Sequence, residues 1–293
     1  MEISDYGPFP YVPINQRPKL TWPGEARVAV WVIPNIEFFP LTHGLAGHAI
    51  EATGKAPTVR PWGQRDYGNR VGIWRIMDVM SKLGIRASAT LNSDVCLHHP
   101  QIVKAGVELG WEFLGHNETN TRRLTEMDPE TELKTIRNCV AQIAETAGTR
   151  PVGWLGAALA ETWHTLDYLI DEGFEYVADW VNDDQPYMMT VNDRKIVSVP
   201  YSYEVNDSPF IYYRNGSIDA FEAMIRKQFD VLYEEGAQSG RVMAICLHPF
   251  IIGVPHRIKG LESALRYIKS HDQVWFATGS EIARHYVQSG ACI

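Results

Sequence analysis

Short apolar runs alternate along this chain with longer segments in which apolar residues recur at helical spacing. Residues 27–33 and 241–247 are almost continuous apolar runs, as expected of strands buried on both faces. Residues 69–83 show the helical spacing, and Gly84 follows as a stop signal. The pattern predicts strands at 27–33, 85–91, 111–114, 151–155, 175–179, 196–200, 241–247 and 274–277, and helices at 69–83, 100–109, 129–146, 162–172, 218–235, 260–270 and 281–288.

About seven alternations of strand and helix predict a parallel sheet, either doubly wound or closed into a barrel. Polar residues stand at or just beyond the carboxyl ends of predicted strands, where α/β barrels place their chemistry. These residues are Glu37, Asn92, Asp94, His116, Asp179 and His248. No glycine-rich phosphate turn follows the first strand, so a dinucleotide-binding sheet has no support. We therefore expect an α/β fold of the distorted (β/α)7 barrel type.

The composition is typical of a globular domain with a sizeable core, since 45% of the 293 residues are hydrophobic and 21% are charged. We expect a single domain over residues 1–293, in which 1–26, rich in proline and aromatic residues, forms an N-terminal arm. The net charge of −8 argues against nucleic-acid binding. Neither a signal peptide nor an apolar stretch of membrane-spanning length is apparent, which predicts a cytoplasmic protein without a membrane partner.

Glu37 and His116 are candidates for proton transfer or metal binding. Glu37 follows an apolar strand, and a carboxyl group among apolar neighbours tends to a raised pKa, which suits a general base. Alternatively, it is a solvated loop acid. His116 follows another strand beside amide and hydroxyl side chains, as a metal ligand or proton carrier does. Alternatively, this segment is a turn in which Asn117 or Asn120 caps the next helix.

His248 ends the most apolar strand, and partial desolvation there predicts a lowered pKa and a role as general acid. Alternatively, it is a core histidine satisfied by one carbonyl group. Residues 176–187 group polar and aromatic side chains that suit a small polar ligand, or an Asx-turn loop with aromatic packing. The substrate-binding candidates in this segment are Asp179, Trp180, Asp183, Asp184 and Tyr187.

Four stretches resemble segments of the polysaccharide deacetylases, also called carbohydrate esterase family four, and the resemblance covers nearly the whole chain. The stretches are 65–74 (RDYGNRVGIW), 151–154 (PVGW), 179–187 and 247–253 (LHPFIIG). The nearest resemblance is to an intracellular branch that includes metal-independent allantoinases and cyclic imide hydrolases. It implies the polysaccharide-deacetylase fold, an amidohydrolase or deacetylase activity, and assembly into a dimer or tetramer. The arm would then cover a barrel end or a neighbouring subunit.

The resemblance also assigns roles to individual positions, and the metal site departs from the family pattern. Glu37 matches the general base, but Phe38 stands where the family has a metal-binding acid. His116 matches the first of two metal-binding histidines, and Asn120 occupies the position of the second. His248 matches the catalytic histidine of the last motif.

One further motif is incomplete. Trp154 matches a strand aromatic and is a candidate for substrate contact, whereas Leu155 stands where the family has an arginine that orients the base. We therefore expect no cofactor, or a divalent metal such as zinc held loosely by His116 with Glu37 and Asn120. His43 and His48, in the loop after Glu37, are possible additional ligands.

The expected reaction is hydrolysis of a carbon–nitrogen bond in a small cyclic amide, ureide or imide, because a strained ring opens without a metal more readily than an acetamide. Glu37 would activate water, and His248 would protonate the leaving nitrogen. His116, Asn120 and backbone N–H groups would stabilise the oxyanion. Two alternatives stay open: a metal-dependent N-deacetylase of an acetylated sugar or small amide, and a non-catalytic small-molecule-binding protein with a degenerate metal site.

Overall fold

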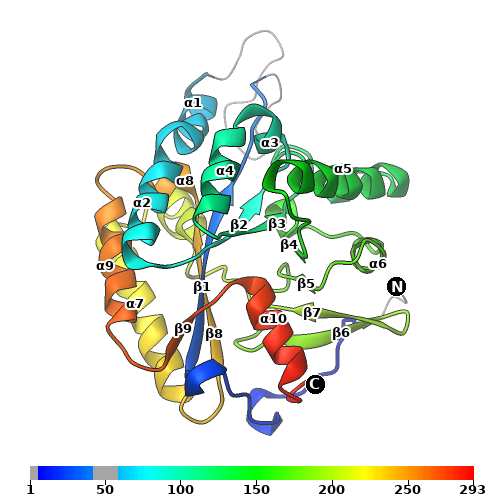
Figure 1. Ribbon diagram of the computed structural model, residues 1–293, viewed down its shortest axis with the longest axis vertical. Helices are drawn as coiled ribbons and strands as arrows, with labels where there is room; N and C mark the ends of the chain where they lie inside the picture. The colour runs from blue at the N-terminus through cyan, green and yellow to red at the C-terminus, as the bar shows by residue number, and fades with distance from the viewer. Residues whose placement is uncertain (1–5, 42–58) are drawn as a thin grey trace.

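The computed structural model describes residues 6–41 and 59–293, and a curled, mostly parallel sheet runs through its centre (Figure 1). The strand order is β6-β7-β5-β4-β3-β2-β1-β8, and β9 also pairs with β1. The strands are β1 (Val28–Ile36), β2 (Ser88–Leu91), β3 (Glu112–Gly115), β4 (Gly153–Trp154), β5 (Tyr176–Val177), β6 (Tyr187–Val191), β7 (Arg194–Ser198), β8 (Arg241–Leu247) and β9 (Val274–Phe276). The α-helices are α1 (Val59–Tyr67), α2 (Ile73–Leu83), α3 (Asp94–His98), α4 (Pro100–Glu108), α5 (Pro129–Ala147), α6 (Thr165–Asp171), α7 (Ile218–Glu235), α8 (Pro249–Ile252), α9 (Ile258–Lys269) and α10 (Gly279–Gln288).

The predicted alternation of strand and helix is confirmed in its main elements, but the helices α1, α3 and α8 and the strand β6 were not predicted. All strand pairs are parallel except β6 and β7, which form an antiparallel hairpin. Asn192 and Asp193 make its two-residue turn, both with positive φ, as the tight turn of a twisted hairpin requires. The sequence analysis predicted the strand around β7 but missed β6.

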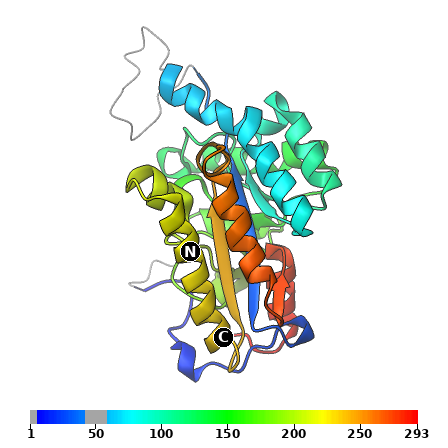
Figure 2. The ribbon, with the colours of Figure 1, turned by 90° about the vertical axis from the view of Figure 1, so that its left-hand side faces the viewer.

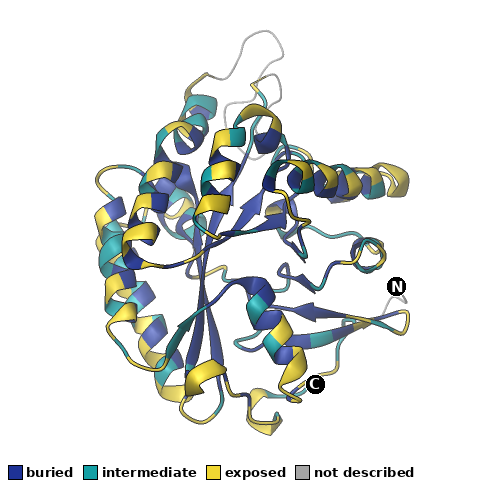
Figure 3. Ribbon diagram, in the orientation of Figure 1, coloured by how far each residue is buried: buried dark blue, intermediate teal, exposed yellow. Residues whose placement is uncertain are grey.

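Two apolar cores lie on the two faces of the sheet, because successive side chains of a strand point to opposite sides. In β1, Val28, Val30 and Val32 pack outward against helices, whereas Ala29, Trp31 and Ile33 fill the interior of the curl. Helices α7 and α9 lie side by side over the outer face (Figure 2). The outward sides of the helices are exposed and the strands are buried (Figure 3). In the described residues, no helix combines the length and apolarity needed to cross a lipid bilayer.

The described part of the N-terminal arm covers the end of the sheet at which the parallel strands begin. Leu20 and Trp22 are buried within the inner core. The Trp22 indole Nε1–H donates to the carbonyl oxygen of Arg241, the first residue of β8, at 2.9 Å. Arg17 forms a bidentate ion pair with Asp183 at 2.7 and 2.6 Å. These contacts hold the described part of the arm against this end of the sheet.

The barrel is closed by irregular chain rather than by a further strand pair. The backbone N–H of Val242 donates to the carbonyl oxygen of Asp184 at 2.8 Å, and that of Cys246 donates to Val205 at 3.0 Å. These bonds attach the outer edge of β8 to the segments before and after the β6–β7 hairpin. The curl therefore brings the carboxyl ends of distant strands around one space.

A close approach of two glycines fixes the turn after β8. Gly72 ends a π-helical turn, η3 (Gly68–Gly72), that packs on α8. A Cβ atom at Gly72 would collide with the carbonyl oxygen of Pro249, and one at Gly253 would collide with the same oxygen and with Gly72. Glycine is required at both positions because backbone approaches backbone directly. The chain that follows His248 is thereby held against η3 and α2.

Candidate active site

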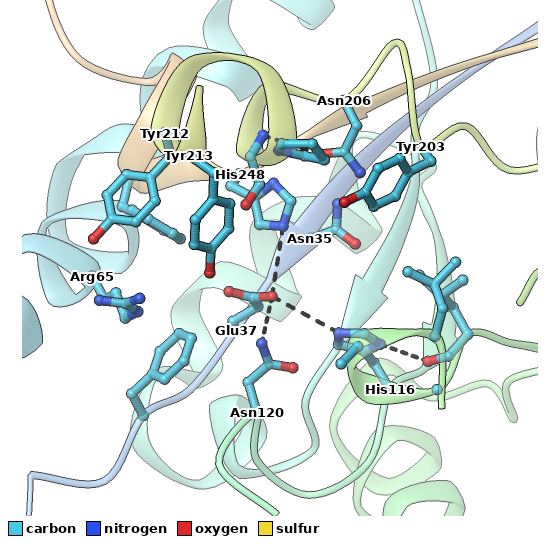
Figure 4. Close-up of a pocket in the computed structure, with 18 of the residues that line it drawn as sticks. Asn35, Glu37, Arg65, His116, Asn120, Tyr203, Asn206, Tyr212, Tyr213 and His248 are labelled. Carbon is cyan, nitrogen blue, oxygen red and sulfur yellow. Dashed lines mark hydrogen bonds and ion pairs between the residues drawn. The ribbon is translucent and has the colours of Figure 1, made fainter. Parts of the chain in front are cut away.

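A cavity of about 280 Å³ opens among the loops at the carboxyl ends of the strands (Figure 4). Side chains from the ends of β1, β3 and β8, from the chain after β7 and from the π-helical η6 (Ser208–Tyr213) line it. Its polar lining residues are Asn35, Glu37, Arg65, His116, Asn120, Thr121, Arg123, Tyr201, Tyr203, Asn206, Ser208, Tyr212, Tyr213 and His248. Glu37, His116, Asn120 and His248, which the sequence analysis selected, thus line one space.

Asn92 ties two of the strand-end loops together. Its Oδ1 accepts the backbone N–H of Phe38 at 2.9 Å, and its Nδ2 donates to the carbonyl oxygen of His116. Asn92 is completely buried, so these bonds are shielded from water and hold the two loops in register. They place the side chains of Glu37 and His116 in the same cavity.

Glu37 is a buried carboxylate at the floor of the cavity, 9% exposed. Its Oε1 accepts a hydrogen bond from Asn120 Nδ2 at 2.8 Å, and its backbone carbonyl accepts one from Asn69 Nδ2 at 2.8 Å. Burial raises the pKa of Glu37 above its ordinary value, although the charges of His248 and Arg65 oppose the rise. The expectation of a raised pKa is confirmed.

His248 faces Glu37 and is fixed from behind by a second carboxylate. His248 Nε2 lies 3.6 Å from Glu37 Oε1, and its Nδ1 lies 2.7 Å from Asp207 Oδ1. The backbone N–H of His248 also donates to both Asp207 oxygens, at 3.0 and 2.9 Å. With Nδ1–H donated to Asp207, Nε2 is the atom that meets a ligand.

The prediction of a lowered pKa for His248 is wrong. Burial does favour the neutral ring, but the carboxylates of Glu37 and Asp207 outweigh it and raise the pKa of His248 above its ordinary value. The apolar strand before His248 indicates desolvation, but the partner carboxylate comes from another segment and cannot be identified from the strand itself. A histidine that holds its proton near neutral pH is better suited to act as a general acid.

His116 lies on the other side of Glu37 and stays neutral. Its Nδ1 lies 2.5 Å from the carbonyl oxygen of Leu155, so Nδ1 carries the hydrogen. Its Nε2 therefore presents a lone pair, 4.0 Å from Glu37 Oε1. Burial lowers the pKa of His116 to about 4. The expectation that His116 donates a hydrogen bond to an oxyanion is wrong, because neither nitrogen has a hydrogen to offer the cavity.

The residues around Glu37 do not suit the metal site that the resemblance implies. The Phe38 ring is not in the cavity but stacks on His98, with centroids 4.4 Å apart. Within residues 6–41 and 59–293, no group of three or more His, Cys, Asp or Glu side chains is arranged to hold a metal ion. His43 and His48 lie outside the described residues.

The remaining substrate-binding candidates lie elsewhere, which corrects those predictions for this cavity. Trp154 is fully buried and packs edge-on against Phe174. Asp179 lies behind the cavity wall, where its Oδ1 accepts the backbone N–H of Gly156 at 2.8 Å. Trp154 and Asp179 therefore support the wall instead of touching its contents.

The segment from Trp180 to Tyr187 binds the N-terminal arm. The rings of Trp180 and Tyr187 pack against Phe9, with centroids 5.3 and 4.8 Å away. Asp183 pairs with Arg17, and Asp184 accepts a backbone hydrogen bond from β8 through its carbonyl. The aromatic-packing alternative considered for this segment describes it better than the ligand-binding one.

Several cavity residues were missed by the sequence analysis. Asp207, which is buried behind His248 and not in the cavity lining itself, is the N-cap residue of η6, with no strand to mark it as a site residue. Asn35 is an interior residue of β1 whose Nδ2 donates to Tyr201 Oη at 3.1 Å. A polar residue inside an otherwise apolar strand was the available signal for Asn35. Arg65 lay within a motif that the resemblance had already marked.

Known proteins are similar to this chain in sequence and in fold. No family model matches the chain. A Schizosaccharomyces pombe protein described as a polysaccharide deacetylase is 28% identical over 303 aligned residues, covering 93% of each chain. A crystal structure from Pseudomonas aeruginosa PAO1, described as a polysaccharide deacetylase, superposes with a TM-score of 0.85 at 27% identity, covering 94% of this chain and 96% of that one.

A crystal structure of PuuE allantoinase is similarly close. It superposes with a TM-score of 0.84 at 27% identity, covering 94% of this chain and 95% of that one. Sequence and fold thus agree over nearly the whole length of these proteins. The chain is thus similar over nearly its whole length to proteins described as polysaccharide deacetylases, which indicates a hydrolytic enzyme, and an allantoinase is among its structural relatives.

Proposed function

We propose that this protein hydrolyses a carbon–nitrogen bond in a small cyclic amide, ureide or imide. The observation that carries the proposal is the pair of Glu37 and His248, which face each other at 3.6 Å in one cavity, each held by a separate partner. A base and an acid on opposite sides of a bound ligand are what amide hydrolysis needs. The name of one structural relative, an allantoinase, agrees with a cyclic ureide as substrate.

In the proposed reaction, Glu37 takes a proton from a water molecule as the water oxygen attacks the ring carbonyl carbon. Asn120 keeps the carboxylate in position by donating to Oε1. The tetrahedral intermediate then breaks its carbon–nitrogen bond, and His248 Nε2 gives its proton to the leaving nitrogen. Asp207 stabilises the imidazolium form of His248 before that transfer.

Several of the donors that the sequence suggests for the developing oxyanion already make hydrogen bonds within the protein. Asn120 Nδ2 already donates to Glu37, and the backbone N–H groups of Gly156 and Ala157 donate to Asp179 and Asn117. Figure 4 shows the side chain of Tyr213 reaching over the cavity with its hydroxyl toward Glu37. We therefore assign the Tyr213 hydroxyl as the oxyanion donor.

We further propose that the reaction requires no tightly bound metal, because Phe38 and Asn120 replace two ligands and Phe38 points away from the cavity. The cavity volume of about 280 Å³ suits a ring of a few atoms and not a polymer. Because Glu37 and His248 supply the proton transfers, a strained ring is the substrate class that least needs a metal ion to activate its carbonyl group.

The test is a hydrolysis screen over hydantoin, allantoin, succinimide and acetylated amino sugars, before and after dialysis against a strong chelator. We expect turnover of at least one cyclic compound, unchanged by the chelator and lost in Glu37→Gln. Turnover of acetylated sugars alone, or activity that disappears with the metal and returns with zinc, would replace this proposal with metal-dependent deacetylation.

A further inference from the structure

The wall of the cavity beside His116 presents hydrogen-bond acceptors. His116 Nε2 has a lone pair because Nδ1–H is committed to the carbonyl oxygen of Leu155. Asn120 donates its amide Nδ2 to Glu37, so its Oδ1 is also left as an acceptor. Two hydrogen-bond acceptors of this wall, His116 Nε2 and Asn120 Oδ1, therefore lie where a ligand could donate to them.

The Asn120 acceptor is not satisfied within the part of the chain that the structure describes. There Asn120 Oδ1 is buried and has no hydrogen-bond partner, and the neighbouring His116 is only 3% exposed. Rotating the Asn120 amide would turn its oxygen toward the Glu37 carboxylate, and two acceptors would then face each other. A buried acceptor without a partner costs about 1–3 kcal/mol, so the wall favours a ligand that supplies hydrogens.

The side of the cavity opposite His116 presents hydrogen-bond donors. His248 Nε2 and the Tyr213 hydroxyl are donors, directed at the space above Glu37 (Figure 4). A ligand that lies between the two sides meets acceptors on one edge and donors on the other. The rim of a cyclic amide, ureide or imide carries N–H donors and C=O acceptors in one plane, so such a ring can make hydrogen bonds to both sides.

We propose that the cavity selects its substrate by a ring N–H that donates to His116 Nε2 and Asn120 Oδ1. This inference rests on the proposed hydrolysis of a cyclic amide and names the feature of the substrate that the site recognises. The substrate class is therefore an unsubstituted ring amide, ureide or imide, and compounds methylated on nitrogen are excluded. A methyl group would remove the hydrogen and press an apolar group against two buried acceptors.

Binding to the wild-type protein tests this with matched compounds. Dissociation constants of succinimide and N-methylsuccinimide, and of hydantoin and its doubly N-methylated form, would be measured by ligand-observed NMR. We expect each methylated compound to bind at least about tenfold more weakly than its parent, since one hydrogen bond is lost and a buried acceptor is left unpaired. Equal affinities within both pairs, or no binding by either parent ring, would overturn the inference.

The variant Asn120→Leu locates the discrimination in this wall. It removes the Oδ1 acceptor, so the ratio of affinities between parent and methylated ring should fall toward one, a change that general loss of structure would not produce. Thr121→Val is the matched control, because it removes a polar atom from the same cavity lining while keeping both acceptors. A full affinity ratio in Asn120→Leu would contradict the assigned contact.

Turnover of the same compounds separates this inference from the proposed function. If the parent rings bind selectively but are not hydrolysed, the recognition of the ring N–H is supported and the proposed hydrolysis is contradicted. If parent and methylated rings are hydrolysed and bound alike, hydrolysis stands and recognition through N–H falls.

Discussion

Glu37 lies between two buried histidines whose surroundings give them opposite protonation. His116 and His248 both direct Nε2 at Glu37 Oε1, from 4.0 and 3.6 Å. Burial favours the neutral ring in both, but only His248 has the carboxylates of Glu37 and Asp207 acting to hold its proton. The group behind Nδ1, a carbonyl in one case and a carboxylate in the other, thus assigns one ring to accept and the other to donate.

The largest difference between the two histidines is expected in activity, when each is replaced by glutamine. We expect His248→Gln to lower kcat by about 10²–10⁴-fold, because it removes the general acid. His116→Gln should raise KM by about tenfold with a smaller effect on kcat, because one hydrogen bond to the ligand is weakened. Steady-state kinetics on a hydrolysed ring checks both, and equal losses of kcat would show that the two rings share one role.

Asp207→Asn should make His248 resemble His116 in its protonation. The amide can still accept the backbone N–H of His248 but carries no charge, so the pKa of His248 should fall. We expect kcat to drop by about 10–100-fold, the usual cost of losing such a supporting partner. The alkaline limb of the pH–rate profile should also move to lower pH. If it does not move, Asp207 does not set the pKa of the general acid.

The pH dependence of the wild-type enzyme should follow from Glu37 and His248 alone. The rate should rise as Glu37 loses its proton, with a midpoint above its ordinary pKa because burial raises it. It should fall as His248 loses its proton, with a midpoint above the ordinary value because two carboxylates hold that proton. The His116 ring should stay neutral over this range, which NMR titration of the histidines can check.

The smallest expected effect concerns Asp179, which supports the His116 side of the cavity as Asp207 supports the other. Burial raises the pKa of Asp179 from 3.8 to about 7. Its contribution to stability is therefore complete below the unfolded-state pKa and is lost as pH rises through about 7. Asp179→Asn should lack this loss, so its unfolding free energy should fall less than that of the wild type as the pH is raised to neutral.

Urea unfolding at several pH values would measure that difference. Asp193→Asn, in the exposed turn of the β6–β7 hairpin, is the control and should leave the wild-type pH dependence of stability unchanged. A steeper dependence in Asp179→Asn would mean that the carboxylate, and not the protonated acid, holds Gly156.

Local pattern was enough to predict most of the order of strands and helices and the convergence of Glu37, His116 and His248, whereas Asn120 was indicated by the resemblance. The rule that parallel strands end at one edge of the sheet does not depend on side-chain detail. The β6 strand was missed because its turn, Asn192-Asp193, carries no glycine and the segment was interpreted as a binding loop. Asp183 was misassigned because its partner, Arg17, lies 166 residues away.

Protonation could not be predicted in the same way. Which ring nitrogen carries a hydrogen depends on the atom facing it, and the Leu155 carbonyl and Asp207 carboxylate come from other parts of the chain. The resemblance matched His116 to a metal-binding histidine of the family, but only its contact with Leu155 shows which ring nitrogen faces the cavity. Roles in this site are thus set by tertiary contacts more than by residue type.

The crossing of Gly72 and Gly253 links the position of His248 to a helix far away in the sequence. Because no side chain separates the two backbones, even one added methyl group would push the segment after His248 outward and carry the imidazole with it. Engineering efforts that leave the cavity lining untouched could therefore still abolish turnover. Random mutagenesis scored by activity should find these two positions as intolerant as the ionisable residues themselves.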